Sequence, residues 1–406
     1  MNTQTTLGII GGGQLGKMML QYCSRIGIKT YVYDSSQYSV CSDICSHLDI
    51  GDFHDYNKLM EFGRKCSIIT FEIENISINA LEDLEKEGII IFPRPNTLKI
   101  IQNKYSQKMF FKKNNIPTCK FTYYSSLHKI KKDILNKKLS LPVIWKKTKA
   151  GYDGFGVKLI KDIDEINNLG IIYDSEDSSD SSNSTISIID GQECIIEEVV
   201  PIVKEISILV ARNQQGEIVI YDPLEMVFNN NTNQLDHVFQ PCVIPYKIQE
   251  KCKEITKQIV TLFNYVGIMA VEMFYTYNGN VFVNEIAPRP HNSGHLTIES
   301  CCATSQFEQH IRAVLDMPLG KTSFYRPACM FNIIGHPEYM GIANYNTNNI
   351  KQLISMENAY IHIYGKLKTY PNRKLGHITI VGKGKPSKEM VKKINEKTKI
   401  KSLNNE

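Results

Sequence analysis

Two glutamates on facing predicted strands are the residues of this chain best placed to do chemistry. Residues 267–276 and 280–286 are typical of strands, and the Asn-Gly pair between them is typical of a two-residue hairpin turn. Counting pairs back from this turn sets Glu272 opposite Glu285. Like charges that face each other destabilise a sheet, so we expect a cation between them. Because carboxylate oxygens and substrate phosphates suit Mg²⁺, the sequence predicts a magnesium site.

An ordinary solvated hairpin is the alternative, with both acids pointing into water. The same count of pairs places Phe274 and Val283 on the face that carries the acids. Two apolar neighbours indicate that this face of the hairpin is partly buried. We therefore expect the two acids to lie in a partly enclosed site.

The segment after Glu285 carries groups that suit an anionic substrate. Two prolines stiffen this segment. It presents a guanidinium, an imidazole, an amide and a hydroxyl, which belong to Arg289, His291, Asn292 and Ser293. We expect these four residues to lie near the metal. His291 is a candidate general base by residue type, and a structural hydrogen-bonding role for it is equally open.

A glycine-rich turn near the N-terminus is the next chemical signal. Residues Gly11–Gly16 follow an apolar strand and open a helix, and Asp34 lies 18 residues beyond Gly16. This spacing matches the dinucleotide fingerprint and by itself favours a nicotinamide-dependent dehydrogenase. The amides of such a turn also bind other phosphates, including that of a sugar phosphate. The rest of the chain must decide between these ligands.

A second glycine-rich loop favours ATP. Residues Gly151–Gly156 are flanked by predicted strands, so this loop can close over a triphosphate, and a plain β-turn is the alternative. Lys104 and Lys146 are candidates to neutralise phosphate oxygens. Lys146 is the stronger candidate, because it follows the apolar run 142–145 and so lies at the end of a strand.

An apolar strand beyond this loop offers a surface for the nucleoside. Residues Glu197–Val200 belong to the apolar run 194–200, and their backbone can hydrogen-bond an adenine edge. Glu205 follows shortly afterwards and can accept from ribose hydroxyls. Both assignments extend the prediction of an ATP site.

The composition is that of an ordinary globular protein. With 406 residues, of which 42% are hydrophobic and 22% charged, the chain is long enough for two or three domains. The net charge of +5 is small and the lysines are not clustered, so we expect no nucleic-acid partner. The eleven cysteines are scattered along the chain, which indicates reduced thiols in a cytoplasmic protein. No apolar run approaches 18 residues, so we expect no membrane partner.

The order of predicted elements indicates an α/β and α+β architecture. Alternating short strands and helices over residues 7–95 predict a Rossmann-like parallel sheet, and a helix over 96–114 leads out of it. The acidic, serine-rich stretch 175–185 predicts a disordered surface insertion. The boundaries that we expect are 1–96 for an N-terminal domain, 97–320 for a central domain with a small lobe near 118–192, 321–395 for a β-rich C-terminal domain, and 396–406 for a tail.

Together these motifs resemble the ATP-grasp superfamily, and closely resemble its 5-(carboxyamino)imidazole ribonucleotide synthase branch. The resemblance spans nearly the whole chain, from Gly8 to about Gly384. The motifs that carry it are Gly11–Gly16, Phe71–Asn75, Gln102–Lys104, Gly151–Gly156, Lys204–Ser207, Asn284–His295, Thr304–His310 and Lys374–His377. The segment Asn284–His295 is highly specific, whereas the glycine motifs are not. The resemblance implies a Rossmann-like N-terminal domain, a two-lobed ATP-grasp domain and a small β-rich C-terminal domain.

The resemblance also implies roles for residues at matching positions. Glu272 and Glu285 would hold Mg²⁺, while Arg289, His291, Asn292 and Ser293 would line the place where bicarbonate and the ribonucleotide meet. ATP would be bound by Lys104, Lys146, Gly151, Tyr152, Asp153, Gly154, Phe155, Gly156, Val157, Glu197, Glu198, Val199, Val200, Glu205, Asn284 and Glu285. Aminoimidazole ribonucleotide would be bound by Gly13, Gln14, Leu15, Glu72, Glu74, Asn75, Lys366, Arg373 and Lys374.

The reaction that the resemblance implies belongs to purine biosynthesis. A bicarbonate oxygen attacks the γ-phosphate of ATP and gives carboxyphosphate and ADP, and the exocyclic amine of the ribonucleotide then takes up the carboxyl group as phosphate leaves. Phosphoryl transfer requires positioning and charge neutralisation, which Mg²⁺, Lys146 and Arg289 can supply. Carboxyphosphate decomposes in water, so a closing loop at 151–157 has a physical purpose. The resemblance also implies a homodimer.

The sequence departs from this branch at three positions. Phe155 and Val157 stand where the branch usually has a cation and a glutamine, and Phe228 lies near the position of a common histidine. Each loss removes a polar group expected near the nucleotide, which leaves weaker ATP binding or a non-catalytic nucleotide-binding relative open. A formate-dependent glycinamide ribonucleotide transformylase on the same scaffold and a nicotinamide-dependent dehydrogenase are two further candidate functions.

Overall fold

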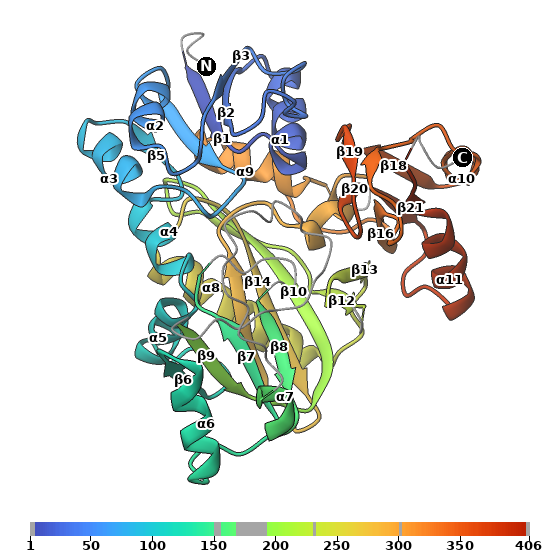
Figure 1. Ribbon diagram of the computed structural model, residues 1–406. Helices are drawn as coiled ribbons and strands as arrows, with labels where there is room; N and C mark the ends of the chain where they lie inside the picture. The colour runs from blue at the N-terminus through green and yellow to red at the C-terminus, as the bar shows by residue number, and fades with distance from the viewer. Residues whose placement is uncertain (1–4, 150–155, 168–192, 230–232, 300–302, 403–406) are drawn as a thin grey trace.

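The computed structural model describes residues 5–149, 156–167, 193–229, 233–299 and 303–402. The strands in these residues form a parallel five-stranded sheet, an antiparallel four-stranded sheet, a ten-stranded sheet and a two-stranded ladder. Figure 1 shows the parallel sheet at one end of the long central sheet, the four-stranded sheet at the other end, and the C-terminal strands to one side. The predicted mixture of α/β and α+β architecture is confirmed.

The N-terminal sheet is wholly parallel, as the alternation of strands and helices predicts. Its strand order is β3-β2-β1-β4-β5. Leu7 and Ile9 pack with residues of α1, whereas Ile10 packs with residues of α2 and α3. The pairing of β1 with β4 brings their carboxyl ends together, where the glycine turn and Glu72 follow. The elements are β1 (Thr6–Ile10), α1 (Gln14–Arg25), β2 (Lys29–Asp34), β3 (His47–Ile50), α2 (Tyr56–Gly63), β4 (Ile68–Phe71), α3 (Ile78–Lys86) and β5 (Ile90–Ile91).

The single helix predicted over residues 96–114 is wrong, because the structure has two helices there, α4 (Pro95–Ile101) and α5 (Lys104–Lys113). The Asn103 side chain accepts a hydrogen bond from a first-turn amide of α5 at 3.0 Å and so caps a new helix. The Lys104 amide donates to the Thr148 carbonyl at 2.8 Å. This contact starts α5 beside the end of a strand of the next sheet.

The four-stranded sheet is antiparallel, with the order β6-β9-β7-β8, and encloses a small core around Trp145. Strand β9 ends at Glu198, so Val199 and Val200 lie beyond the strand in which the sequence placed them. The loop 151–155 and the serine-rich stretch 175–185 lie outside the described residues. The elements are β6 (Phe121–Tyr124), α6 (Leu127–Leu135), β7 (Val143–Lys147), β8 (Val157–Ile160), α7 (Ile163–Asn167) and β9 (Cys194–Glu198).

The ten-stranded sheet extends from the central domain into the C-terminal part, because β13 pairs with β16. Its main order is β15-β14-β10-β12-β13-β16-β20-β18, with β11 beside β10 and β21 beside β16. Its strands are β10 (Ile202–Arg212), β11 (Ile218–Ile220), β12 (Leu224–Phe228), β13 (Leu235–Gln240), β14 (Gly267–Thr276), β15 (Val281–Ala287), β16 (Ala328–Gly335), β18 (Ala359–Ile363), β20 (Lys374–Val381) and β21 (Lys399–Ile400).

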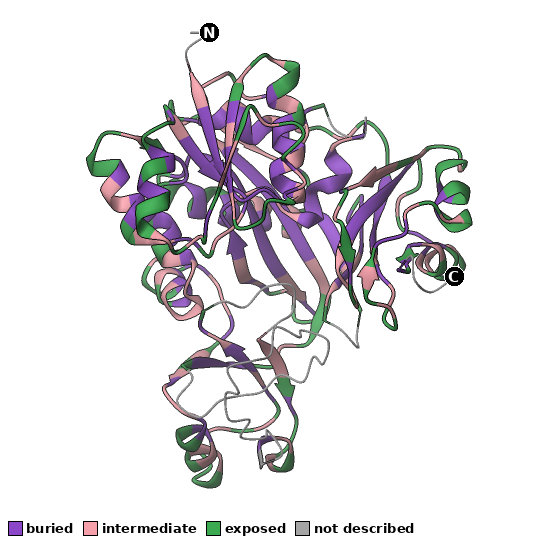
Figure 2. Ribbon diagram, turned by 45° about the horizontal axis from the view of Figure 1, so that its top comes forward, coloured by how far each residue is buried: buried purple, intermediate pink, exposed green. Residues whose placement is uncertain are grey.

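Helices cover this sheet, and a short ladder flanks it. Those helices are α8 (Tyr246–Leu262), the 3₁₀ helix η1 (Asn292–Thr297), α9 (Gln306–Val314), α10 (Asn348–Ile354) and α11 (Lys388–Lys397), and the ladder is β17 (Gly341–Ile342) with β19 (Lys368–Thr369). Figure 2 shows buried residues along the sheet strands and exposed residues on the outer helices. None of the helices in the described part of the chain is long and apolar enough to cross a bilayer.

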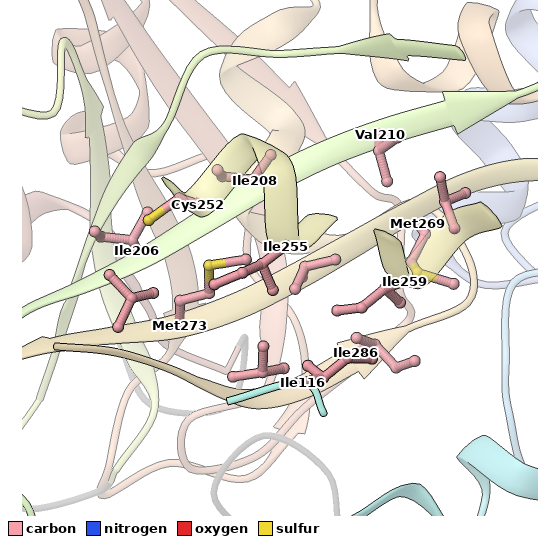
Figure 3. Packing of buried hydrophobic residues seen from close by; sticks show 14 of the residues in the cluster. Ile116, Ile206, Ile208, Val210, Cys252, Ile255, Ile259, Met269, Met273 and Ile286 are labelled. Atoms are coloured by element: carbon pink, nitrogen blue, oxygen red, sulfur yellow. The ribbon is translucent and has the colours of Figure 1, made fainter. Parts of the chain in front are cut away.

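The largest core lies between α8 and the strands that carry the two glutamates. Figure 3 shows Ile255 of α8 between Ile208 of β10 and Met273 of β14, and Ile259 of α8 beside Met269 of β14. Removing this apolar surface from water supplies the main stabilisation of the region. The opposite face of these strands packs into a second apolar core around Leu209 and Ala270, and it carries Glu205 and Glu272 beyond that core.

Candidate active site

Glu272 and Glu285 are cross-strand partners on β14 and β15, which confirms the predicted pairing. The register near the turn is not the one expected. The Thr276 amide donates to the Asn280 carbonyl at 3.0 Å and Gly279 has a φ of +74°, so the loop has three residues instead of two. A bulge at Asn284 then shifts the pairing by one residue and restores the match between the two acids.

Val283 was expected on the acid face, and this prediction is wrong. Val283 pairs with Met273 and is fully buried in the core under α8. A one-residue shift in register moves every side chain to the other face of a strand, and the three-residue loop causes that shift here. Beyond the bulge, Asn284 and Glu285 both reach the polar side, although they are consecutive residues.

Three carboxyl groups gather on this polar face, from Glu205, Glu272 and Glu285. Burial raises the pKa of Glu272 to about 8, with further contributions from Glu285 and Glu205. Burial also raises the pKa of Glu205 to about 7, against the attraction of Lys146. Burial opposes ionisation of Glu285 too, but Lys104 and Lys146 outweigh it and lower the pKa of Glu285. A cation bound among these groups would favour the ionised forms of Glu205 and Glu272.

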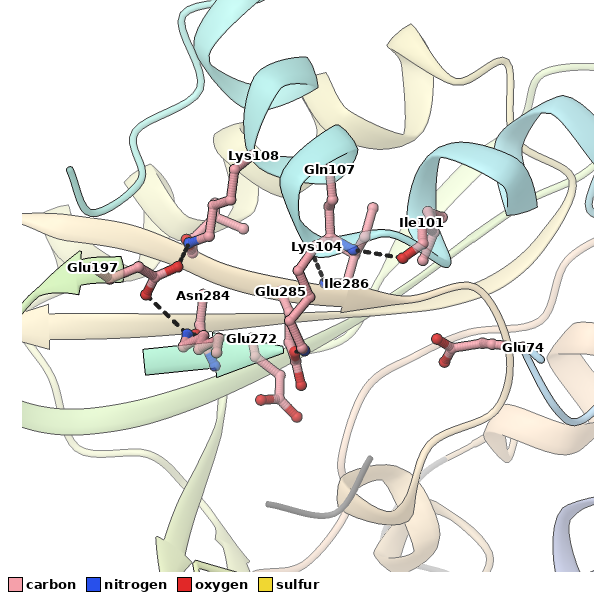
Figure 4. Close-up of polar contacts among 12 residues, drawn as sticks. Glu74, Ile101, Lys104, Gln107, Lys108, Glu197, Glu272, Asn284, Glu285 and Ile286 are labelled. Atoms are coloured by element: carbon pink, nitrogen blue, oxygen red, sulfur yellow. Dashed lines mark hydrogen bonds and ion pairs between the residues drawn. The ribbon is translucent and has the colours of Figure 1, made fainter. Parts of the chain in front are cut away.

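Lys104 of α5 lies beside Glu285 (Figure 4). The Lys104 ammonium forms an ion pair with the Glu285 carboxylate. The Lys146 ammonium donates to the Asn284 side-chain oxygen at 2.7 Å. Val157 pairs with Lys146 across β7 and β8, and Gly156 accepts a hydrogen bond from the Lys147 amide at 2.8 Å. The described end of the second glycine-rich loop therefore lies beside Lys146.

Lys108 is a charged residue of this network that the sequence pattern did not reveal. Its ammonium lies 2.9 Å from one oxygen of Glu197, and the Lys146 ammonium lies 2.9 Å from the other. Lys108 also donates to the Thr118 hydroxyl at 2.7 Å. Burial opposes ionisation of Glu197, but the two lysines lower its pKa to about 2. Lys108 lies one helical turn after Lys104 on α5, and this i,i+4 spacing was the available signal.

Glu197 therefore acts through its side chain in this structure, as the shared partner of two lysines. Its neighbour Glu198 is exposed and lies 3.7 Å from the ammonium of Lys120. A backbone contact with adenine was the role expected of this segment. Strand β9 still places the backbone of Glu197 and Glu198 at the edge of the polar cluster.

The predicted segment after Glu285 folds back onto the acids. His291 Nε2 lies 3.5 Å from Glu272 Oε1, and His291 Nδ1 lies 2.8 Å from the Ser293 hydroxyl. The Ser293 hydroxyl in turn lies 2.8 Å from that of Ser207 on β10. Both polar atoms of the buried Asn292 amide lack a hydrogen-bond partner among the described residues. His291 is thus held between a carboxylate and a hydroxyl, beside an amide available to a ligand.

Arg289 connects this segment to the N-terminal domain. Its guanidinium lies 3.0 Å from Glu74 Oε1. Burial raises the pKa of Glu74, and Arg289 opposes that shift. Asn75, the next residue, is exposed. The ion pair places the loop after β4 at the edge of the same site.

The glycine turn of residues 11–16 holds a protein carboxylate. The amides of Gly13 and Gly16 donate to the two oxygens of Glu72. Gly11 has a φ of +99°, which favours glycine, and a Cβ there would lie 2.5 Å from Glu72 Cγ. Burial raises the pKa of Glu72, and the two amides oppose it. The amides of Gln14 and Leu15 belong to the first turn of α1, which has no intrahelical acceptors for them.

The C-terminal part reaches this turn through Lys366. This ammonium is close enough to Glu72 to oppose the rise in its pKa. The Lys17 ammonium, on α1, donates to the Tyr364 carbonyl at 2.8 Å and fastens the two parts together. Arg373 instead donates to the Lys368 carbonyl at 2.8 Å, so it is engaged within its own loop. Lys374 lies close to His295.

Family models match three successive parts of the chain. They describe a ribonucleotide synthetase pre-ATP-grasp domain over residues 4–102, an ATP-grasp domain over 109–307 and a phosphoribosylaminoimidazole carboxylase C-terminal domain over 328–390. The matched regions together cover both the described site and the C-terminal strands.

Relatives along the whole chain extend these matches. The chain is 34% identical over 383 residues to the chloroplastic phosphoribosylaminoimidazole carboxylase of Vigna aconitifolia, covering 93% of this chain and 64% of that protein's length. It is 32% identical over 392 residues to the N5-carboxyaminoimidazole ribonucleotide synthase of Bacillus subtilis, covering 96% of this chain and 94% of that protein.

A solved structure has the same fold. This is the Aspergillus clavatus N5-carboxyaminoimidazole synthase in complex with ADP and 5-aminoimidazole ribonucleotide, which is similar with a TM-score of 0.82 and 27% identity, over 98% of both chains. With the near full-length match to the Bacillus protein, these findings place the chain in the N5-carboxyaminoimidazole ribonucleotide synthase family of ATP-grasp proteins.

Proposed function

We propose that this chain uses ATP and bicarbonate to carboxylate the exocyclic amine of 5-aminoimidazole ribonucleotide, giving N5-carboxyaminoimidazole ribonucleotide, ADP and phosphate. The observation that carries the proposal is the facing pair Glu272 and Glu285, with Lys104, Lys146 and Asn284 around it. The names and ligands of the relatives support the same substrates. Family membership leaves the nicotinamide dehydrogenase alternative without support.

The lysines of the site would bind the triphosphate. Lys104 and Lys146 approach the acids from different elements, α5 and β7, so they can contact different phosphate oxygens. The Lys104 ammonium pairs with the Glu285 carboxylate, and the Lys146 ammonium donates to the Asn284 amide oxygen. A phosphate oxygen can replace either of these partners. Phosphoryl transfer depends mainly on such positioning and charge neutralisation.

The two acids fit a hard divalent cation. Glu272 and Glu285 offer carboxylate oxygens on one polar face, and their mutual repulsion contributes to the raised pKa of Glu272. A cation between them would remove that repulsion. Mg²⁺, when bound, would neutralise charge on the phosphate oxygens and polarise the γ-phosphate.

Bicarbonate and the ribonucleotide would meet beside Arg289, His291, Asn292 and Ser293. Arg289 is oriented by Glu74, and Asn292 offers an amide with both polar atoms unpaired among the described residues. A bicarbonate oxygen attacks the γ-phosphorus and ADP leaves. The amine nitrogen then attacks the carboxyl carbon, phosphate leaves and the nitrogen loses a proton. Shielding from water matters between these steps, because carboxyphosphate hydrolyses.

The ribonucleotide phosphate would lie at the start of α1. The first-turn amides of Gln14 and Leu15 would bind it there, and the Lys366 ammonium is close enough to Glu72 of the same turn to affect its pKa. Glu72 keeps the glycine turn in shape through its two amide contacts. Arg373 and Lys374 would approach the same phosphate only after leaving their present neighbours.

The test is ADP release by the full chain, measured with ATP, Mg²⁺, bicarbonate and aminoimidazole ribonucleotide, leaving out each component in turn. We expect release to require all four. A parallel reaction with formate and glycinamide ribonucleotide tests the transformylase alternative. Release that depends on formate, or that ignores the ribonucleotide, would contradict the proposal.

Two finer expectations follow from the family. We infer a homodimer, which multi-angle light scattering on the purified chain would test. We also infer a cytoplasmic location, and the nine described cysteines, all free thiols, are consistent with a reducing compartment.

A further inference from the structure

A group of buried and half-buried histidines lies where the C-terminal strands meet the segment after η1. His362 on β18 and His377 on β20 are direct cross-strand partners. Their rings are stacked, with centroids 4.5 Å apart and planes 8° apart. Such partners project from the same face of a sheet, so their ring nitrogens can approach one ligand together.

Glu299 joins this pair from outside the sheet. One of its carboxylate oxygens contacts His362 Nε2. Glu299 is only 6% exposed and His377 is fully buried. One candidate ligand atom from each of the three residues lies within 4.8 Å of the others. Three separate segments of the chain therefore deliver one carboxylate and two imidazoles to one small volume.

Two atoms in this group have no protein partner. Glu299 Oε2 and His377 Nε2 are buried and lack a hydrogen bond among the described residues. Buried polar atoms are nearly always paired, so two such atoms in one cluster require an explanation. Both belong to a group that brings a carboxylate and imidazoles together, and a shared cation would satisfy them at once.

The ring of His377 is held as a metal ligand would be. Its Nδ1 lies 2.9 Å from the Tyr364 hydroxyl. When Nδ1 carries the proton and donates it to that hydroxyl, Nε2 keeps its lone pair, which is the usual arrangement in metal-bound histidine. His295 stacks on His377, with ring centroids 4.5 Å apart, and so limits the rotation of the ring.

We propose that Glu299, His362 and His377 bind a divalent transition-metal ion of the zinc type, at a site separate from the facing glutamates. Two imidazoles with one carboxylate suit zinc better than magnesium, which prefers oxygen ligands alone. Tetrahedral zinc would bring the ligand atoms to roughly 3.4 Å from one another, a small side-chain adjustment. The ion would tie β18 and β20 to the segment that follows His291–Ser293.

The test uses the full chain, stripped of metal by chelation and titrated with Zn²⁺ in the absence of nucleotide. We expect one equivalent to bind and the melting temperature to rise, because the ion binds only the folded state. Co²⁺ should bind at the same site and give the visible absorption of a tetrahedral nitrogen–oxygen complex. Failure of the wild type to bind a stoichiometric ion would overturn the proposal.

Variants locate the site. E299Q and H362Q should each weaken Zn²⁺ binding at least about tenfold and remove the thermal shift. H362Q is the safer variant, because the His362 side chain is 26% exposed and the fold does not depend on its burial. H128Q, which removes an exposed histidine, and E272Q, which removes a carboxylate of the other site, should leave Zn²⁺ binding unchanged. Unchanged binding in E299Q and H362Q, or equal loss in H128Q or E272Q, would refute the assignment.

Discussion

Two buried glutamates a short distance apart in this molecule have opposite electrostatic surroundings. Glu197 lies between the ammonium groups of Lys108 and Lys146, each 2.9 Å away, and its pKa falls to about 2. Glu272 faces Glu285 and Glu205, and burial together with their charge raises its pKa to about 8. Burial acts against ionisation in both places. The neighbours therefore decide the outcome.

This contrast separates a carboxylate that supports the site from one that awaits a ligand. The charge of Glu197 is already compensated by protein groups, so Glu197 holds Lys108 and Lys146 in place. Glu272 has carboxylate neighbours that raise its pKa, so a bound cation would favour its ionised form. A buried carboxylate with carboxylate neighbours is thus the stronger indication of a ligand site.

Removing one of the two facing glutamates should have the largest effect. Glu285→Ala removes one of the two facing carboxylates and should lower bicarbonate-dependent ADP formation by at least about 100-fold, because charge stabilisation during phosphoryl transfer is lost. Circular dichroism and the melting temperature should show a folded protein. An active, folded variant would contradict the metal assignment. Glu87→Ala, in an exposed ion pair, is the matched control and should retain full activity.

Removing one of the two lysines that pair with Glu197 should lower the free energy of unfolding. Lys108→Met leaves Glu197 with one lysine, and breaking a buried pair typically costs about 3–5 kcal/mol of the free energy of unfolding. Urea unfolding at pH 7 measures this change, with Lys112→Met on the exposed face of α5 as control. A loss no larger than that of the control would show that Lys108 is not required by Glu197.

The same comparison predicts a pH dependence for Lys108→Met. Because the pKa of Glu197 is lowered in the folded state, its ionised form adds stability above the usual carboxyl pKa near 4.5, and that contribution is lost as pH falls toward 2. The difference in unfolding free energy between wild type and variant should therefore shrink as pH falls through this range.

His310 is a third buried titratable group, and its surroundings favour the neutral imidazole. His310 on α9 accepts a hydrogen bond from the Ile268 amide at 3.1 Å, and its other nitrogen lies 2.7 Å from the Thr70 hydroxyl on β4. Burial lowers its pKa to about 3. The unfolded chain binds one more proton between that value and about 6.5, so stability should fall with decreasing pH by up to about 1.4 kcal/mol per unit. His310→Gln should reduce this slope in urea unfolding at pH 5 and 7, and an unchanged slope would exclude His310 as its source.

The smallest expected effect concerns the departure at Phe155. Phe155→Lys would introduce the cation that the family usually has at this position, and one added charge of this kind is worth up to about 1 kcal/mol, or about a fivefold lower KM for ATP. Steady-state kinetics at saturating ribonucleotide measures the change, with Phe155→Leu as a size control. An unchanged KM would indicate that this loop binds phosphate through its backbone.

Only part of the hairpin could be read from the sequence. Local alternation and the Asn-Gly turn were enough to predict the hairpin, since its two strands are adjacent along the chain. The predicted turn had two residues, whereas the observed loop has three. The bulge at Asn284 compensates for this difference and restores the predicted pair. A bulge depends on packing against the rest of the sheet, as the buried Val283 shows, and so leaves little local signal.

Residues close together in the chain were sufficient to predict the parallel N-terminal sheet, the hairpin that carries the two acids and the family, because each depends on local alternation or on a contiguous motif. Tertiary contacts were needed to show that Glu72 fills the glycine turn, that Lys108 and Lys146 share Glu197, and that Glu299 meets His362 and His377. Each of these contacts joins different elements of the fold. Short-range patterns carry no information on which distant side chain will compensate a buried charge.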